Sequence, residues 1–215
     1  MTADATTLRA STDKGLVFIV DDDVAVRRGL RNLFKSAGFN VEAFGSAAEM
    51  AQSSQSDFAN CLVLDVRLPI LDGIEIQKDL AQSNRQIPII FITGHADVPT
   101  TIQAMKGGAV DFFTKPVDGR AILSAVAAAV GRDKRRREAE GVETTLLAMF
   151  SALTPREREV MTLVTSGLMN KQVAAELGLR EITVKIHRGN IMKKMKAKSL
   201  PDLVRIADAI SLIRT

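Results

Sequence analysis

The 215-residue chain contains no Trp, no Tyr, one Cys and no long uninterrupted apolar run. The absence of Trp and Tyr argues against an aromatic-rich interface or a platform on which nucleic-acid bases stack. Cys61 lies inside an apolar stretch and cannot build a disulfide framework, which fits a reducing compartment. No run approaches the roughly 18 apolar residues that a membrane span needs, and the start of the chain lacks the apolar segment of a signal peptide. We therefore expect a cytoplasmic protein without membrane contact.

The charge is unevenly distributed along the chain. Residues 1–120 hold 12 Lys and Arg against 15 Asp and Glu, a net charge of −3, whereas residues 151–215 hold 12 against 6, a net charge of +6. The length suggests one domain of about 120 residues and a smaller second domain. An acidic front and a basic back predict different partners, with nucleic acid a candidate for the basic part.

The first half alternates apolar stretches with segments of helical periodicity. The apolar stretches cover residues 16–20, 40–44, 61–64, 87–92 and 109–113. They are mainly continuous apolar runs, as expected where helices cover both faces of a parallel sheet. We therefore predict an α/β domain built on a doubly wound, five-stranded parallel sheet of the flavodoxin-like type.

Acidic residues stand where two of the predicted strands end. Asp21 and Asp22 follow the first strand, and Asp65 follows the third. Parallel strands deliver their carboxyl ends to one edge of a sheet, so these carboxylates should converge there with Thr93 and Lys115. Like charges this close need a cation, and ligands that are all oxygen suit Mg²⁺. The pattern therefore predicts a magnesium site beside a carboxylate that can receive a phosphoryl group.

An alanine-rich and then charged segment, residues 121–150, joins the two halves. Its apolar residues recur at helical spacing, although Gly131 and Gly141 weaken the case for one unbroken helix. We predict a largely helical linker over residues 131–150, between domains at 15–130 and 151–215. A flexible tether is the alternative.

The last part of the chain has a purely helical pattern. Thr154 and Glu157 form a capping box around a proline at the first helical position. A short helix over 171–177, a turn at Gly178 and a longer helix over 182–195 form a predicted helix-turn-helix. We therefore predict an all-α, four-helix domain.

Four motifs of the first half occur in a fixed order: FIVDDD at 18–23, LVLDVRLPILDG at 62–73, FITGHADV at 91–98 and DFFTKP at 111–116. In order and spacing they resemble the receiver domain of two-component response regulators. The residues of the second and third motifs are similar to those of the FixJ-type branch of that family.

This resemblance implies roles for the strand-end residues. Asp65 would accept a phosphoryl group from a sensor histidine kinase, and Lys115 would place a positive charge on that group. Thr93 and Phe112 would shift together as a switch, and a cis peptide would precede Pro116. Mg²⁺, which neutralises charge on the transferred oxygens, would be held by Asp21, Asp22, Asp65 and the backbone carbonyl of Arg67.

Residues 153–195, LTPREREVMTLVTSGLMNKQVAAELGLREITVKIHRGNIMKKM, resemble the LuxR/NarL-type DNA-binding domain. The resemblance makes 171–177 the scaffold helix and 182–195 the recognition helix. It places toward the major groove Thr183, Lys185, Ile186, His187, Gly189 and Asn190. The candidates for phosphate contacts are Lys171, Arg188, Lys193 and Lys194. The chain departs from the family at Arg180, where a serine often caps the recognition helix, and losing that cap costs about 1 kcal/mol.

We therefore expect a transcriptional response regulator, not an enzyme. Its expected partners are a cognate sensor histidine kinase, double-stranded promoter DNA, RNA polymerase and, after phosphorylation, a second copy of the chain. One alternative is a haloacid-dehalogenase-type phosphatase with Asp21 as nucleophile and Asp23 as acid/base, but no acidic pair of the kind that family needs follows Lys115. The other alternative is a regulator that binds DNA regardless of phosphorylation, with the receiver serving only as a dimerisation module.

Overall fold

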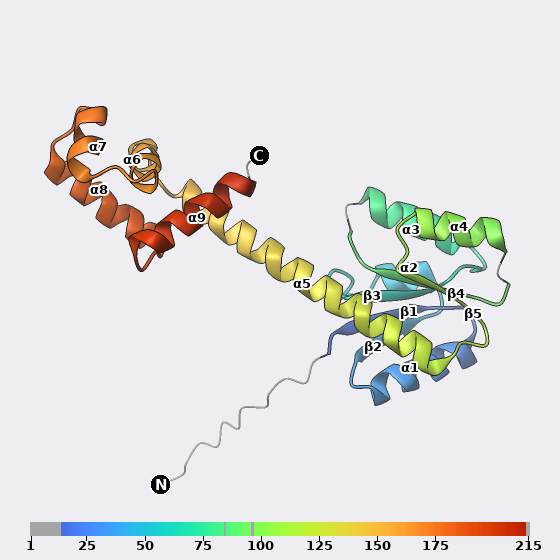
Figure 1. Ribbon diagram of the computed structural model, residues 1–215. Coiled ribbons are helices and arrows are strands. Elements are labelled where there is room, and N and C mark those ends of the chain that lie inside the picture. Colours follow the sequence, from blue (N-terminus) through green and yellow to red (C-terminus); the bar gives the residue numbers. More distant parts are fainter. Residues whose placement is uncertain (1–13, 84, 96, 214–215) are drawn as a thin grey trace, which may run out of the picture. The chain divides into compact units, whose positions relative to one another are not determined.

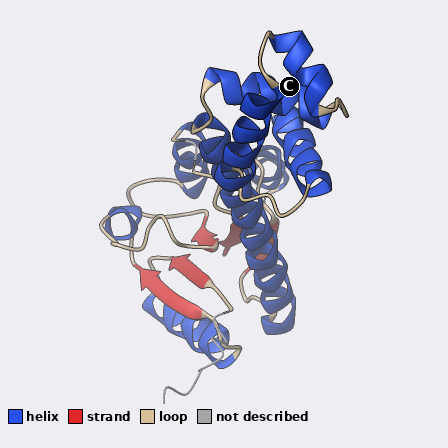
Figure 2. Ribbon diagram, turned by 90° about the vertical axis from the view of Figure 1, so that its left-hand side faces the viewer, coloured by secondary structure: helices blue, strands red, loops and turns tan. Residues whose placement is uncertain are grey.

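The computed structural model describes residues 14–83, 85–95 and 97–213. The start of the chain, for which we expect no signal peptide, lies outside these ranges, as do residues 214–215 of the second predicted domain. The chain divides into two compact units between Arg136 and Arg137. The strands of the described residues lie in the first unit, and the second is built from helices (Figure 2).

The first unit contains a five-stranded, fully parallel sheet (Figure 1). Its strands are β1 (Leu16–Val20), β2 (Asn40–Phe44), β3 (Cys61–Asp65), β4 (Ile89–Thr93) and β5 (Asp111–Thr114). Their order across the sheet is β2-β1-β3-β4-β5. The predicted doubly wound parallel sheet is therefore confirmed.

Helices cover both faces of this sheet. Helices α2 (Ala47–Ala51), α3 (Gly73–Gln82) and α4 (Val98–Lys106) pack on one face, and α1 (Val24–Ser36) and the first part of α5 (Gly119–Ser151) pack on the other. Alternate residues of β1 serve the two faces: Phe18 packs with the α2–α4 side, and Val17 and Ile19 pack with the α1–α5 side. Burial on both sides explains why the strands are apolar throughout.

Helix α5 continues without a break past Gly131 and Gly141. Val126 and Val130 bury its first part against the sheet, and Met149 packs its last turns into the core of the second unit. Each glycine in a helix interior costs about 1 kcal/mol relative to alanine. The packing at both ends of the helix offsets that cost, so the glycines do not interrupt it.

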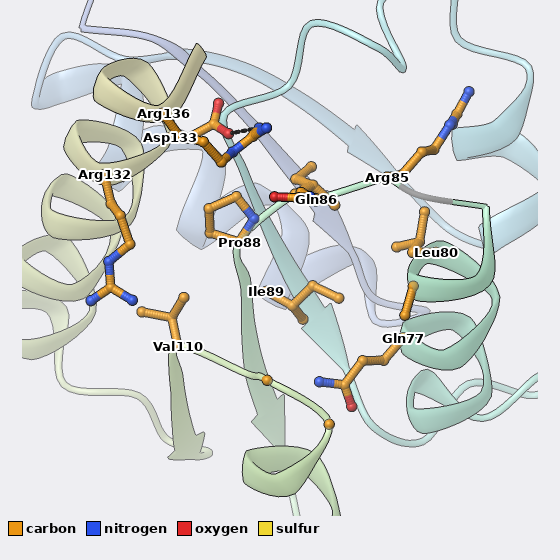
Figure 3. Close-up of a pocket in the computed structure, with 14 residues that line it drawn as sticks. Gln77, Leu80, Arg85, Gln86, Pro88, Ile89, Val110, Arg132, Asp133 and Arg136 are labelled. Carbon is orange, nitrogen blue, oxygen red and sulfur yellow. Dashed lines mark hydrogen bonds and ion pairs between the residues drawn. The ribbon is translucent and has the colours of Figure 1, made fainter. Parts of the chain in front are cut away.

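A buried polar network ties α5 to the first unit. Asp133, 1% exposed, accepts hydrogen bonds from Nδ2 of Asn60 at 2.9 Å and from a guanidinium nitrogen of Arg136 at 2.5 Å. Oδ1 of Asn60 accepts the backbone N–H of Leu16 at 2.9 Å. Figure 3 shows the Asp133–Arg136 pair beside Pro88, at the rim of a pocket near the beginning of β4. Since Leu16 begins β1, the network fastens α5 at the edge of the sheet where the strands start.

The second unit consists of the end of α5 with α6 (Pro155–Thr165), α7 (Asn170–Leu177), α8 (Glu181–Lys194) and α9 (Leu200–Ile213). Its core contains Val160, Val173, Val184 and Ile191. The predicted capping box is present at the start of α6, and Gly178 ends α7 in the left-handed region with φ +64°. Within the described ranges, no helix has the length and apolar character that crossing a bilayer requires.

Candidate functional site

The strand register brings four of the predicted residues to one edge of the sheet. The residues immediately before Asp21 and Asp65 pair with each other in the β1–β3 ladder. Lys115 directly follows the residue that pairs with Thr93, and its backbone N–H donates to the carbonyl of Thr93 at 2.7 Å. The carboxyl ends of β1, β3, β4 and β5 therefore present these side chains together.

A cluster of three carboxylates lies at this edge. Oxygens of Asp21, Asp22 and Asp65 are all within 4.8 Å of one another. Asp21 is fully buried and Asp65 is 4% exposed, whereas Asp22 faces solvent. Nζ of Lys115 lies 2.7 Å from Oδ2 of Asp21 and 2.6 Å from Oδ2 of Asp65. The ammonium therefore bridges the two buried carboxylates.

The surroundings of these groups shift two pKa values. Burial raises the pKa of Asp21, although contact with Lys115 and a hydrogen bond from the N–H of Asp23 act in the opposite direction. Burial alone would lower the pKa of Lys115, but the contacts with Asp21 and Asp65 outweigh it and raise that pKa. Lys115 therefore stays charged at neutral pH and acts as the counter-ion of the cluster.

This donor set fits a divalent cation such as Mg²⁺, as in receiver domains. All the ligand atoms are oxygens, the kind that Mg²⁺ prefers. Oδ2 of Asp21 is buried and receives no well-directed hydrogen bond among the described residues, so its contact with Lys115 is a pairing of charges. The N–H of Arg67 donates to Oδ1 of Asp65 at 3.0 Å, which holds the Arg67 backbone beside the cluster. The site thus has an acceptor atom for which the protein supplies no directed donor.

The two predicted switch residues lie on β4 and β5. Thr93 is buried, and its hydroxyl donates to the carbonyl of His95 at 3.1 Å and accepts the N–H of His95 at 3.3 Å. Phe112 is half-buried, with its ring centroid 6.3 Å from that of Phe91. The Lys115–Pro116 peptide is cis. In this arrangement the Thr93 hydroxyl is bonded within its own loop and not to the acidic cluster.

Two residues of the site were missed by the sequence analysis. A guanidinium nitrogen of Arg27 donates to the backbone carbonyl of Asp21 at 2.5 Å, which fastens α1 to the end of β1. A Cβ at Gly73, in the first turn of α3, would clash with the backbone carbonyl of Asp65. The Asp72-Gly73 pair signalled a turn, but no pattern indicates that the glycine is needed for close approach.

Asp23 has a structural role. Its carboxylate caps α1 by accepting the N–H groups of Ala25 at 2.7 Å and Val26 at 3.3 Å. An Asp occupied in this way is turned toward its own helix and not toward Asp21. The geometry therefore disfavours the phosphatase alternative, in which Asp23 acts as acid/base.

In the second unit, α8 presents one exposed face. It carries Ile182, Lys185, Ile186, Gly189, Asn190 and Lys193. Ile186 is 59% exposed, which is unusual for a large apolar side chain. Thr183 and His187 are half-buried, and Nδ1 of His187 is buried without a hydrogen-bond partner among the described residues. The exposed face contains most of the residues predicted to face the major groove.

The cations predicted to contact phosphates fall into two groups. Lys171 and Lys193 are exposed. Arg188 instead donates to Oδ1 of Asn170 at 2.6 Å, and Lys194 lies 2.7 Å from Oε2 of the buried Glu157. As expected from the departure at the start of the recognition helix, Arg180 gives α8 no side-chain cap.

The fold and the acidic edge define a receiver domain, and comparison with known proteins establishes the class. Residues 17–127 match the family model described as Response regulator receiver domain. Residues 151–207 match the model described as Bacterial regulatory proteins, luxR family. The chain belongs to the two-component response regulators with a LuxR-type DNA-binding domain. These proteins are transcriptional regulators rather than enzymes.

Individual relatives place the chain more closely. It is 58% identical to Nodulation protein W of Bradyrhizobium diazoefficiens, over 94% of this chain and 89% of that protein. It is 39% identical to Transcriptional regulatory protein FixJ of the same organism, over 91% of this chain and 96% of that protein. The solved structure of response regulator StyR matches with a TM-score of 0.84 at 46% identity, over 90% of this chain and 98% of that one. The predicted similarity to the FixJ-type branch is confirmed.

Proposed function

We propose that the chain switches transcription when a sensor histidine kinase phosphorylates Asp65. The observation that carries this proposal is the contact between the Asp65 carboxylate and Lys115 inside the acidic cluster. We assign the receiver to residues 15–130, the linker to 131–150 and the DNA-binding domain to 151–215, and we place the protein in the cytoplasm.

The chemistry follows from the position of Lys115. An oxygen of Asp65 attacks the phosphorus, and the bond from phosphorus to the kinase histidine nitrogen breaks. Because Nζ of Lys115 is 2.6 Å from Oδ2 of Asp65, its charge lies where phosphoryl oxygens would gather. Mg²⁺ would be held by Asp21, Asp22, Asp65 and the Arg67 carbonyl, and it would neutralise charge on the transferred group.

The signal would leave the site through Thr93 and Phe112. The Thr93 hydroxyl exchanges its bonds within the loop for a phosphoryl oxygen, and Phe112 packs inward into the space beside it. Helix α4 lies between β4 and β5 in the chain, and it exposes Val98 at 71%, Ile102 at 48% and Met105 at 46%. An apolar surface of this kind on a short helix supports a homodimer formed through this face.

The dimer would present two recognition helices to two half-sites of a promoter. We assign groove contacts to Thr183, Lys185, Ile186, His187 and Asn190. Phosphate contacts are assigned to Lys171 and Lys193, whose exposed ammonium groups supply salt-dependent affinity. Contact with RNA polymerase would follow promoter binding.

The acceptor is tested by labelling the full chain with radioactive acetyl phosphate in the presence of Mg²⁺. Asp65→Asn should take up no label. Asp79→Asn, which changes an exposed carboxylate of α3 in the same way, should be labelled like the parent. Persistent labelling of Asp65→Asn would move the acceptor to another residue.

The consequence of phosphorylation is tested with beryllium fluoride, which mimics a phosphoryl group on an aspartate. Gel filtration and DNA binding are measured with and without it. We expect a shift to a dimer and tighter binding. If neither property responds while Asp65 accepts label, the phosphorylation-independent alternative is the correct one.

A further inference from the structure

The scaffold helix α7 is held at both ends by arginines from neighbouring helices. At its start, a guanidinium nitrogen of Arg188 in α8 donates to Oδ1 of Asn170 at 2.6 Å. At its end, a guanidinium nitrogen of Arg156 in α6 donates to the carbonyl of Leu177 at 2.5 Å. Arg156 also pairs with Glu159 at 2.5 Å, which fixes its side chain. The eight-residue helix is therefore clamped between its two neighbours.

The clamp at the start of α7 is the more informative one. The N-cap residue of α7 is Met169, whose side chain makes no cap hydrogen bond, and Oε1 of Gln172 accepts the backbone N–H of Met169 at 2.8 Å. Helix α8 likewise begins after Arg180, whose side chain makes no cap hydrogen bond, so in both helices the N-cap side chain leaves the first-turn N–H groups uncapped. The Arg188–Asn170 bond joins residues 18 positions apart and is a polar side-chain contact between α7 and α8. It therefore restrains the angle between two helices that meet otherwise through apolar packing.

The geometry sets Arg188 apart from the other cations of this surface. Arg188 is half-buried, whereas Lys171, Lys185 and Lys193 are exposed. A charge-assisted hydrogen bond of 2.6 Å to a neutral amide oxygen orients the planar guanidinium fork toward α7. The Arg188 side chain therefore joins α8 to α7 in the absence of DNA.

We propose that Arg188 is a positioning residue for DNA recognition, acting through Asn170 to hold the recognition helix at a fixed angle to the scaffold helix. This role takes the place of the phosphate contact for which the resemblance to the LuxR/NarL family makes Arg188 a candidate. Sequence-specific binding needs the side chains of α8 to meet base edges while α7 meets the backbone, so it depends on that angle. Non-specific binding depends on the number of phosphate contacts and not on the angle.

The test compares Arg188→Met, Asn170→Ala and the double variant in the full chain. Met keeps the apolar stem of Arg188, and Ala favours the helix at Asn170, so both changes remove the bond with little other disturbance. The probes are a duplex enriched from a random pool by the parent chain with beryllium fluoride and Mg²⁺, and an unenriched random duplex. Affinity for each is measured by fluorescence anisotropy over a range of salt concentrations.

Each single variant should bind the enriched duplex about 5- to 20-fold more weakly than the parent, the effect of losing one charge-assisted hydrogen bond. The double variant should be no weaker than either single one, because both remove the same bond. The slope of log affinity against log salt should stay unchanged, and binding to the random duplex should equal that of the parent. Equal binding to the random duplex also shows that the variants are folded.

Lys171→Met is the matched control, since it removes an exposed cation next to Asn170. Its salt slope should fall by about one on both duplexes, as expected for a lost phosphate contact. The proposal is overturned if Arg188→Met shows that same change of slope while Asn170→Ala binds like the parent. It is also overturned if neither variant weakens specific binding, or if the effects of the two substitutions add.

Discussion

Replacing Lys115 by Met should make the stability of the receiver depend more strongly on magnesium than that of the parent. The ammonium lies 2.7 Å from Asp21 Oδ2 and 2.6 Å from Asp65 Oδ2, and the Asp21 carboxylate has no exposure at all. Removing one partner of a buried pair costs about 3–5 kcal/mol, because it leaves an uncompensated charge. The Lys115 side chain is 20% exposed, so solvent screens part of the effect, and we expect a loss of about 2–4 kcal/mol without metal. A divalent cation at 100 times its dissociation constant adds about 2.7 kcal/mol to either chain. It should bind the variant more tightly than the parent, because the variant lacks the ammonium that contacts Asp21 and Asp65, so magnesium should stabilise the variant more.

The assay is urea unfolding followed by circular dichroism, in EDTA and in excess MgCl₂, because the chain has no Trp or Tyr to report by fluorescence. We expect the stability difference between the parent and Lys115→Met to be smaller in excess MgCl₂ than in EDTA, because Mg²⁺ supplies the positive charge that only the variant lacks. Lys106→Met, which removes an exposed ammonium from α4, should unfold like the parent in both buffers. An equal loss for Lys115→Met with and without Mg²⁺ would show that the lysine is not the counter-ion of a metal site.

Three further outcomes follow from the geometry. Burial acts to raise the pKa of Glu157, but hydrogen bonds with Lys194 and Thr154 outweigh it and lower that pKa. The ionised carboxylate therefore stabilises the fold fully at pH values above 4.5, its pKa in the unfolded chain. This stabilisation is lost as the pH falls through the lower pKa of the folded chain. Urea unfolding from neutral pH down to about pH 3 should therefore show a steeper loss of stability for the parent than for Glu157→Gln. Asp133→Ala leaves Asn60 and Arg136 without their buried acceptor and should lower the free energy of unfolding of the first unit by about 2–4 kcal/mol in calorimetry. Gly73→Ala should slow labelling by acetyl phosphate and destabilise the first unit by about 1–3 kcal/mol, since its Cβ would displace the Asp65 backbone; unchanged labelling would contradict the clash.

The sheet could be predicted from the sequence, because a strand that is buried on both faces of a parallel sheet is a continuous apolar run. The helix-turn-helix could be predicted from apolar residues at helical spacing on either side of Gly178. The same holds for strand-end side chains: once parallel strands are assigned, the convergence of Asp21, Asp65, Thr93 and Lys115 follows from topology. The low helix propensity of glycine indicated a weak point of the helix at Gly131, but α5 is continuous there because it is packed at both of its ends.

What sequence did not reveal is the partner of each cation. Arg188 and Lys171 look equivalent in a basic helical segment, yet one is bonded to Asn170 and the other is exposed. Lys194 similarly neutralises the buried Glu157, a contact across 37 residues that no local pattern encodes. The choice between an internal partner and a phosphate depends on the packing of helices and not on residue type. The count of 12 Lys and Arg over residues 151–215 therefore overstates the number of side chains that are available for phosphate contacts.

Asp133 and Asp21, two of the three buried aspartates that the structure describes in the first unit, differ in the kind of partner that the protein supplies. Asp133 accepts hydrogen bonds from Asn60 and Arg136, so its charge is compensated and its role is to fasten α5. Asp21 is equally buried, but its Oδ2 lacks a directed hydrogen bond among the described residues, and its pKa is raised. The Lys115 ammonium pairs with this oxygen by charge, and burial of the carboxylate costs stability; ionisable groups with pKa values shifted in this way gather at functional sites. This contrast, and not the number of acidic residues, supports our proposal that phosphorylation takes place at the strand-end edge, whereas Asp133 at the opposite edge fastens α5.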